Sequence, residues 1–402
     1  MSSPASYASN LPKLYCIRLL FWMQFFAAVL VPFYTDWGGI SLQQVFLLNA
    51  WFFLCSFLFE VPTGTVADYL GRKWSLFLGS AVAMGGVLLY ASKPGLGTFL
   101  AAEAIMAVAY TLHSGADEAL AYDSLKAAGR QSAAAAVIGR MEAFKLGGIV
   151  AATIVGGFIA ARFGLQAPMR ATAIPAALAT LLALTLLEPP GPLRPDENRS
   201  YLRILREGGR QFARHPTIRL LAIEAAVTNA LAWGIIWLFQ PLLRRAGVPL
   251  QAFGVVHALG CVAQIAFLSG VPLLERWAGS KQRLIFAATL LSGLSFLGLA
   301  ATRWWPLVSL GIVAGMAFSL PRVPLFSAAI NHHVASSERA TVLSFCSMIR
   351  TLGIVVMNPV TGFVAERSLD AALLLMGGGL VALALLSRVG EEHLEAHPPP
   401  VP

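Results

Sequence analysis

The chain has 402 residues, of which 57% are hydrophobic and 12% charged, and its mean hydropathy is +0.69. Soluble domains carry roughly 25% charged residues, so this composition excludes a soluble globular protein. The net charge of +9 is distributed over many short loops and forms no single basic face, which argues against nucleic-acid binding.

Twelve apolar stretches follow one another, and each is long enough to cross the ~30 Å hydrocarbon layer of a membrane as a helix. Continuous apolar runs do not fit the alternating pattern of a membrane β-barrel. The sequence therefore predicts an all-α membrane protein. The expected spans are 13–35, 43–66, 74–92, 97–122, 139–161, 167–187, 217–240, 249–274, 284–302, 305–330, 339–364 and 369–388.

The orientation of these spans follows from the loop charges. The first span has no small-residue cleavage site and is too long for a signal peptide, so we expect it to remain as a helix. With an even number of spans, fourteen Lys and Arg residues fall in loops on the side of the termini and seven on the other side. The positive-inside rule then predicts a protein of the plasma (inner) membrane with both termini in the cytoplasm.

A charged run over 64–73 interrupts the apolar sequence between the second and third spans. We expect Asp68 to face the positive N-terminal end of another helix, and Arg72 to pair with Asp123 at the end of the fourth span. Such contacts favour one of two conformations, so we interpret the run as a gate. The predicted gate residues are Gly64, Asp68, Gly71, Arg72, Lys73 and Asp123.

Ionisable side chains inside the spans are candidates for substrate or proton binding, because each costs at least ~2.5–3.5 kcal/mol near the bilayer centre. Arg18 in the first span and Asp117 or Glu118 in the fourth lie at similar depths. The family resemblance described below implies that both spans line one cavity, so we expect these residues to pair. This pair either holds a proton or substrate group, or is a static contact that fixes packing. Glu103, near the outer end of the fourth span, is expected to reach the lipid headgroups.

Two arginines, Arg322 and Arg350, are expected near the membrane midplane. They indicate either an anionic substrate or a buried carboxylate partner, for which Glu142 and Glu224 are the candidates. His257 titrates near neutral pH and is a candidate proton relay. The sequence has no nucleotide-binding loop, esterase-type serine motif or metal-ligand spacing, so we expect no cofactor, no metal and no enzymatic reaction.

A segment rich in Pro and Arg separates two groups of six spans, since proline cannot continue the sixth helix. Its part 201–214 is expected to form either a basic amphipathic helix on the inner membrane face or a plain connection. A shift of about 208 residues places Gly71 on Gly279 and Asp123 on Asn331, which favours an internal duplication. The predicted parts are an N-terminal six-helix bundle over 1–187, a cytoplasmic linker over 188–216, a C-terminal six-helix bundle over 217–390 and a disordered tail over 391–402.

These residues carry a resemblance to a known family. The run 64–73 is similar to the loop signature of the major facilitator superfamily, and the runs 60–64 and 114–125 are typical of a bacterial branch. The resemblance implies two pseudo-symmetric bundles that work by alternating access, and implies that helix 11, starting near Ser337, faces Asp68. The Gly-Pro pair that antiporter members usually carry in helix 5 is absent, and Ala152-Thr153 stands in its place.

The leading hypothesis is a secondary active transporter that moves a small solute by alternating access with a proton as the coupling ion, including drug or metabolite efflux. One alternative is a small organic-anion transporter, for uptake or export. Others are a non-transporting membrane sensor on the same fold and an intramembrane enzyme. The expected partners are a small-molecule substrate, a coupling proton and the lipid bilayer, with no nucleic acid, and the expected state is a monomer.

Overall fold

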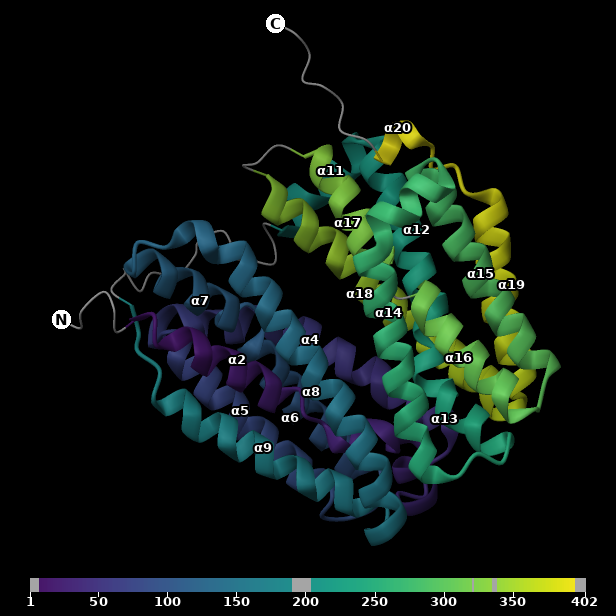
Figure 1. The fold of residues 1–402 in the computed structure, drawn as a ribbon, viewed down its shortest axis with the longest axis horizontal. Coiled ribbons are helices and arrows are strands. Elements are labelled where there is room, and N and C mark those ends of the chain that lie inside the picture. The colour runs from purple at the N-terminus through teal and green to yellow at the C-terminus, as the bar shows by residue number, and fades with distance from the viewer. Residues whose placement is uncertain (1–6, 190–203, 320–321, 335–337, 395–402) are drawn as a thin grey trace, which may run out of the picture. The chain divides into compact units, whose positions relative to one another are not determined.

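The computed structural model describes residues 7–189, 204–319, 322–334 and 338–394, and within these ranges the chain is helical without any strand (Figure 1). The elements of the first half are α2 (Asn10–Phe21), η1 (Phe25–Ala28), α3 (Leu30–Pro32), η2 (Phe33–Trp37), α4 (Leu42–Leu70), α5 (Arg72–Tyr90), α6 (Leu96–His113), α7 (Ala116–Ala127), η3 (Gln131–Ala133), α8 (Ala134–Phe163) and α9 (Gln166–Leu184). Those of the second half are η5 (Ile204–Gly208), α11 (Gly209–Arg214), α12 (Pro216–Trp233), α13 (Ile235–Arg245), α14 (Leu250–Ala278), α15 (Lys281–Ala301), α16 (Trp305–Ser319), α17 (Arg322–His332), α18 (Arg339–Arg367), α19 (Leu369–Leu386) and α20 (Glu391–Leu394).

The spans agree with the sequence in number. In the described ranges, eleven helical stretches are long and apolar enough to cross a membrane, and one bent pair brings the number to twelve. This confirms the predicted all-α membrane fold.

The bent pair is the first span, which the sequence predicts as one helix over 13–35. It consists instead of two pieces, Asn10–Ala28 and Leu30–Trp37, with a bend of 63°. Pro32 removes one backbone N–H donor near the bend. The carbonyl oxygen of Phe25 lies so close to Gly156 of α8 that a Cβ atom has no room there. The break therefore accompanies a close backbone crossing that hydropathy does not report.

The described helices form two compact units. Unit 1 consists of Met1–Ile40, Leu54–Glu197 and Pro249–Ala258, and unit 2 of Ser41–Phe53, Asn198–Val248 and Leu259–Pro402. Each unit therefore includes the first part of one long helix from the other half of the sequence: α4 for unit 2 and α14 for unit 1.

In unit 1, α5 packs against α6 and α9, and α2 packs against α8. A glycine allows the second of these pairs to approach closely, because a Cβ on Gly148 would lie 2.5 Å from the carbonyl oxygen of Leu19. Small residues at such crossings permit the van der Waals packing that holds helices together in lipid. The fully buried apolar side chains of this core include Leu14, Ile17, Leu76, Leu120 and Met141.

In unit 2, α15 packs against α16 and α19, and α12 packs against α18. The first part of α4 lies along α18, where Phe46 contacts Gly362. Three residues further along α4, Oδ1 of Asn49 accepts hydrogen bonds from Nε1 of Trp233 at 2.9 Å and from Nδ2 of Asn358 at 2.7 Å. These bonds satisfy polar groups that otherwise carry a desolvation cost.

Part of the expected amphipathic segment is ordered against α18. Gly208 lies against the side chain of Phe345, and the ring of Phe212 lies 5.5 Å from the same ring. Residues 201–203 are outside the described ranges. Packing on a helix of unit 2 thus accounts for the apolar face of η5 and α11.

The start of the expected disordered tail is helical. Within α20, Leu394 is buried, and the Glu391 carboxylate accepts hydrogen bonds from the backbone N–H groups of Lys281 at 3.0 Å and Gln282 at 2.8 Å. The structure differs from the expectation at residues 391–394 because Glu391 binds the positive N-terminal end of α15. Residues 395–402 lie outside the described ranges.

Candidate functional site

The charged run after the second span forms a tight turn in unit 1. Gly71, with a φ of +98°, separates α4 from α5, and residues with a Cβ rarely adopt this conformation. The Glu188 carboxylate accepts hydrogen bonds from the backbone N–H groups of Arg72 at 3.0 Å and Lys73 at 2.9 Å. It therefore neutralises the positive N-terminal end of α5. Sequence reasoning missed Glu188, and its one signal was an acidic residue directly after the sixth span.

The Arg72 guanidinium also forms an ion pair with Asp123 of α7. The structure thus brings together the two residues that the sequence expects to pair. Gly64 and Asp68 lie in α4, ahead of the turn. The expected partner of Asp68 starts near Ser337, which lies outside the described residues, so that contact stays a prediction.

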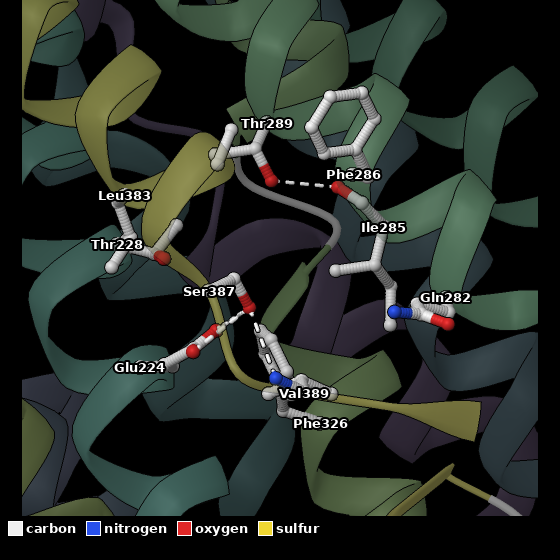
Figure 2. A pocket seen from close by; sticks show the side chains of 11 residues that line it. Glu224, Thr228, Gln282, Ile285, Phe286, Thr289, Phe326, Leu383, Ser387 and Val389 are labelled. Carbon is white, nitrogen blue, oxygen red and sulfur yellow. Dashed lines mark hydrogen bonds between the residues drawn. The ribbon is translucent and has the colours of Figure 1, made fainter.

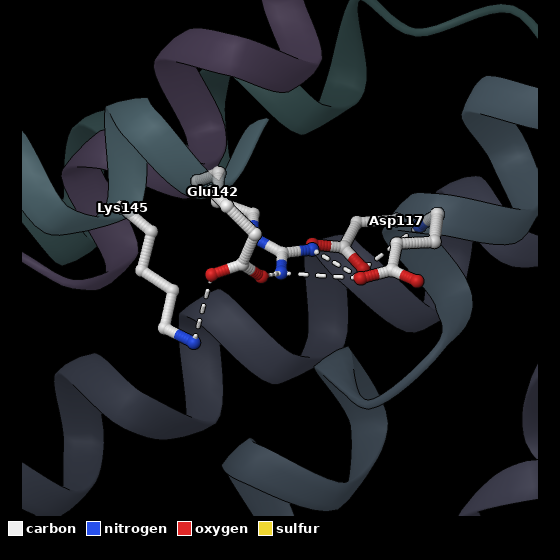
Figure 3. Close-up of polar contacts among 5 residues, drawn as sticks. Asp117, Glu142 and Lys145 are labelled. Atoms are coloured by element: carbon white, nitrogen blue, oxygen red, sulfur yellow. Dashed lines mark hydrogen bonds and ion pairs between the residues drawn. The ribbon is translucent and has the colours of Figure 1, made fainter. Parts of the chain in front are cut away.

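Arg18 lies at the centre of an ion cluster that joins α2, α7 and α8 in unit 1 (Figure 3). One guanidinium nitrogen lies 2.6 Å from Asp117 and 3.2 Å from Glu118, and the other contacts Glu142. Glu142 in turn lies 3.3 Å from Nζ of Lys145. The side chains of Arg18 and Asp117 are 8% and 10% exposed, whereas those of Glu118 and Glu142 are 43% and 41% exposed. The cluster therefore has a dry end and a hydrated edge.

A break in the fourth span positions its two carboxylates. Gly115, with a φ of +73°, separates α6 from α7 and places Asp117 and Glu118 in the first turn of α7. The positive end of a helix stabilises a carboxylate in its first turn by about 0.3–1 kcal/mol. Oδ1 of Asp117 also accepts a hydrogen bond from the backbone N–H of Glu118 at 2.8 Å. The pairing of Arg18 with these residues agrees with the sequence-based expectation.

Glu142 has other partners than those expected. The sequence analysis proposed Glu142 as a partner of Arg322 or Arg350. In the structure Glu142 contacts Arg18 and Lys145, because α8 packs beside α2. Lys145 was missed, although its spacing of three residues from Glu142 is typical of helix ion pairs. The cluster contains three carboxylates and two cations, so it carries one surplus negative charge when every group is ionised.

Glu224 of α12 anchors the chain that follows α19 (Figure 2). Its two carboxylate oxygens lie 2.8 Å from the Ser387 hydroxyl, and one accepts a hydrogen bond from the backbone N–H of Arg388 at 3.3 Å. Glu224 and Ser387, with Thr228 and Gln282, line a cavity of about 50 Å³. Glu224 was a candidate partner for the midplane arginines, and in the described structure it contacts residues 387 and 388.

Arg350 of α18 has no carboxylate partner in the part of unit 2 that the structure describes. Its guanidinium donates a hydrogen bond to Oγ of Ser347 at 3.0 Å, on the same helix. The expected pairing with Glu224 does not occur in the described part of unit 2, and the expected pairing with Glu142 of unit 1 stays a prediction. The side chain lines a cavity of about 180 Å³ together with Ala222, Ala225, Phe326, Ser327, Ile330, Leu343 and Cys346.

Two other candidates, Arg322 and His257, stay predictions. Arg322 is the first residue of α17, and its side chain is outside the described part of the structure. His257 is buried in the segment of α14 that belongs to unit 1.

The Arg350 cavity and the Arg18 cluster occupy corresponding places in the two halves. The shift of 208 residues places Glu142 on Arg350 and Arg18 on Ala226. Where unit 1 holds a filled ion cluster, unit 2 holds a small apolar residue, one cation and a cavity. The charge at this position is therefore reversed between the halves.

Comparison with known proteins identifies the family. A sequence profile of the Major Facilitator Superfamily matches residues 14–287, whereas no curated protein matches the chain. The solved structure of the nucleoside transporter NupG is similar, with a TM-score of 0.77 at 16% identity, covering 93% of this chain and 97% of that one. A POT family transporter in complex with 5-aminolevulinic acid has a TM-score of 0.75 at 12% identity, covering 96% of both chains. A bacterial homolog of the human lysosomal transporter Spinster has a TM-score of 0.71 at 17% identity, covering 96% and 95%.

These likenesses extend over nearly the whole chain, and the family profile covers well over half of it. The chain therefore belongs to the Major Facilitator Superfamily, and it is a multi-pass membrane transporter and not an enzyme.

Proposed function

We propose that this transporter carries a small anion and that Arg350 binds the negative charge of the solute. The observation that supports the proposal is a guanidinium that lines a cavity and meets no carboxylate in the described part of unit 2. A cation without a counter-charge is costly within a membrane span, and a bound anion offsets that cost. The planar fork of arginine donors fits a carboxylate or a phosphate.

The composition of the cavity favours an anion over a hydrophobic cation. Its described lining contains apolar side chains, the Ser327 hydroxyl, the Cys346 thiol and the Arg350 guanidinium, and no carboxylate. A cationic drug that enters this cavity meets a like charge at Arg350 and no opposite charge on the wall. Transport of an anion therefore explains the site better than drug efflux.

A proton is the proposed coupling ion, and the Arg18 cluster is its proposed binding site. What supports this role is the excess of carboxylates over cations together with the exposure of Glu118 and Glu142 at the hydrated edge. A proton that arrives at this edge removes the surplus charge without breaking the short contact between Arg18 and Asp117. The cluster thereby has two charge states in one geometry.

The gate is proposed to lie at the turn between α4 and α5. The Arg72–Asp123 pair and the Glu188 cap support this role because they fix the turn within unit 1 and leave Asp68 close to its end. By the positive-inside rule, the turn faces the cytoplasm of a plasma-membrane protein. Contacts made in one of two conformations bias their equilibrium, which is the requirement for alternating access.

Reconstituted proteoliposomes test the proposed function. A panel of sodium salts of small carboxylates, phosphates and sulfonates is added under an imposed pH gradient, and a trapped dye reports the internal pH. We expect at least one anion to drive proton movement with wild-type protein, none with Arg350→Gln, and partial activity with Arg350→Lys. The matched control is Arg276→Gln, because Arg276 is exposed at the end of α14. Wild-type rates in Arg350→Gln, or activity with hydrophobic cations alone, would refute the proposal.

A further inference from the structure

Glu103 of α6 is a buried carboxyl group outside the sites described above. The sequence places it near the headgroups, but its side chain turns into unit 1, and the residue is 7% exposed. One carboxylate oxygen accepts a hydrogen bond from the Tyr34 hydroxyl at 2.8 Å. The Tyr90 side chain interacts with both Tyr34 and Glu103. Glu103 thus lies in a small polar centre of one carboxyl and two phenols.

Aromatic rings seal this centre from water. The Phe99 ring centroid lies 5.1 Å from that of Tyr34 and 6.0 Å from that of Tyr90. Phe33 packs against Phe99 at 5.7 Å, and Phe33 and Phe99 have no exposed surface. The polar groups of Glu103 therefore have little access to solvent in this conformation.

No cation balances the carboxyl among the residues that the structure describes. The titratable groups that interact with Glu103 are Tyr34 from η2, Tyr90 from α5, Cys55 from α4 and Tyr110 from its own helix. All of these are neutral at physiological pH. Hydrogen bonds from neutral hydroxyls offset only part of the cost of burying a carboxylate. A bound proton removes that cost.

The partner of Glu103 lies on the displaced piece of the first span. Tyr34 belongs to the π-helix η2, within the piece Leu30–Trp37 that is bent by 63° from Asn10–Ala28. Single π-helical turns are frequent at functional sites. The Tyr34–Glu103 bond therefore connects this piece to α6.

We propose that Glu103 is a second proton-binding site, separate from the Arg18 cluster, and that its bound proton holds Leu30–Trp37 against α6. When the proton leaves, the ionised carboxylate draws water into the aromatic shell and Leu30–Trp37 separates from α6. The proton thus biases an equilibrium between two positions of this piece. The inference deepens the proposed proton coupling, on which it rests.

Infrared spectroscopy of the full-length protein in lipid nanodiscs tests the bound proton. A protonated carboxyl has a C=O absorption that a carboxylate and an amide lack. We expect this absorption in the wild type and a weaker absorption in Glu103→Gln. The difference between the two spectra, which is the contribution of Glu103, is expected to decline as the pH rises from about 5 to about 9. The control Glu392→Gln, whose side chain is 67% exposed, is expected to keep the band. Equal absorption of wild type and Glu103→Gln at every pH, or a wild-type band that does not change with pH, would overturn the proposal.

Tyr34→Phe gives a second test that does not depend on the folding of Glu103→Gln. Without the Tyr34 hydroxyl as donor, the C=O band is expected at a higher frequency, and an unmoved band contradicts the assigned contact. Amide hydrogen exchange over residues 30–37 tests the movement. The amide exchange rate of residues 30–37 in the wild type, divided by that in Glu103→Gln, is expected to rise several-fold as the band declines. A constant ratio refutes the proposal that the Glu103 proton holds Leu30–Trp37 in place. These spectra need no solute, so their outcome is independent of whether Arg350 binds an anion.

Discussion

The ion cluster of unit 1 offers a quantitative test of the link between burial and energy. In the cluster, Arg18 contacts one buried and two half-exposed carboxylates. Arg18→Gln removes the cation that Asp117 meets at 2.6 Å and leaves this carboxylate 10% exposed without a counter-charge. Breaking a buried pair from one side costs about 3–5 kcal/mol of the free energy of unfolding. We expect a loss of this size from the single variant.

Two double-mutant cycles separate the contacts. We expect a coupling energy of about 2–3 kcal/mol between Arg18→Gln and Asp117→Asn, because this pair is short and dry. For Arg18→Gln with Glu118→Gln we expect less than about 1 kcal/mol, since the contact is 3.2 Å long and the Glu118 side chain is 43% exposed. The difference follows from solvent screening and not from the number of contacts.

The assay is equilibrium unfolding of the purified protein in mixed micelles, with wild type, the three single variants and the two double variants measured together. Coupling energies are compared between the two cycles, so a shared effect of the micelle cancels. Equal coupling energies, or a larger value for the Glu118 cycle, would show that burial does not determine which of these contacts is stronger.

Three further predictions concern the scaffold and the gate. Gly156→Ala forces a Cβ into the carbonyl of Phe25 and should destabilise by more than about 3 kcal/mol, whereas Gly147→Ala faces open space and should change stability by less than about 1 kcal/mol in the same unfolding assay. Glu188→Gln removes the charge that binds the first turn of α5 and should cost about 0.5–2 kcal/mol, and an unchanged unfolding midpoint argues against the cap. Asp68→Asn should slow anion-driven proton movement in proteoliposomes at equal membrane abundance, and wild-type rates would exclude Asp68 from the gate.

The features that the sequence predicts depend on position along one helix. Span number follows from the length of apolar runs, and the depth of a charge follows from the rise of ~1.5 Å per residue. Equal depth, together with the family resemblance, led to the pairing of Arg18 with the start of α7, and loop position led to the pairing of Arg72 with Asp123. Both pairs join elements whose ends the sequence locates directly.

The features that the sequence misses depend on the direction in which a side chain leaves its helix. Depth places Glu103 near the headgroups, but the rotation of α6 about its own axis turns the carboxyl toward Tyr34. The partner of Glu142 depends on α8 lying beside α2, and the cap by Glu188 depends on a contact 115 or 116 residues away along the chain. These contacts depend on which helices cross and at what rotation, and composition and periodicity determine neither.

The duplication indicated by the 208-residue shift is visible in the packing. In unit 2, Phe46 of α4 lies on Gly362 of α18, where a Cβ would be 2.6 Å away. The shift places Phe46 on Gly254, and in unit 1 Gly254 of α14 approaches the backbone of Thr153 in α8 so closely that it leaves no room for a Cβ. The same crossing thus occurs in both units. In unit 2 the glycine belongs to α18, and in unit 1 it belongs to α14.

The chemistry has diverged on this repeated scaffold. At one shared position unit 1 has Glu142, inside a cluster with excess negative charge, and unit 2 has Arg350, beside a cavity. The shift also replaces the other charged members of the cluster with uncharged residues, so the two sites differ in both the number and the sign of their charges. Under the proposed function, this difference assigns the proton to unit 1 and the anion to unit 2.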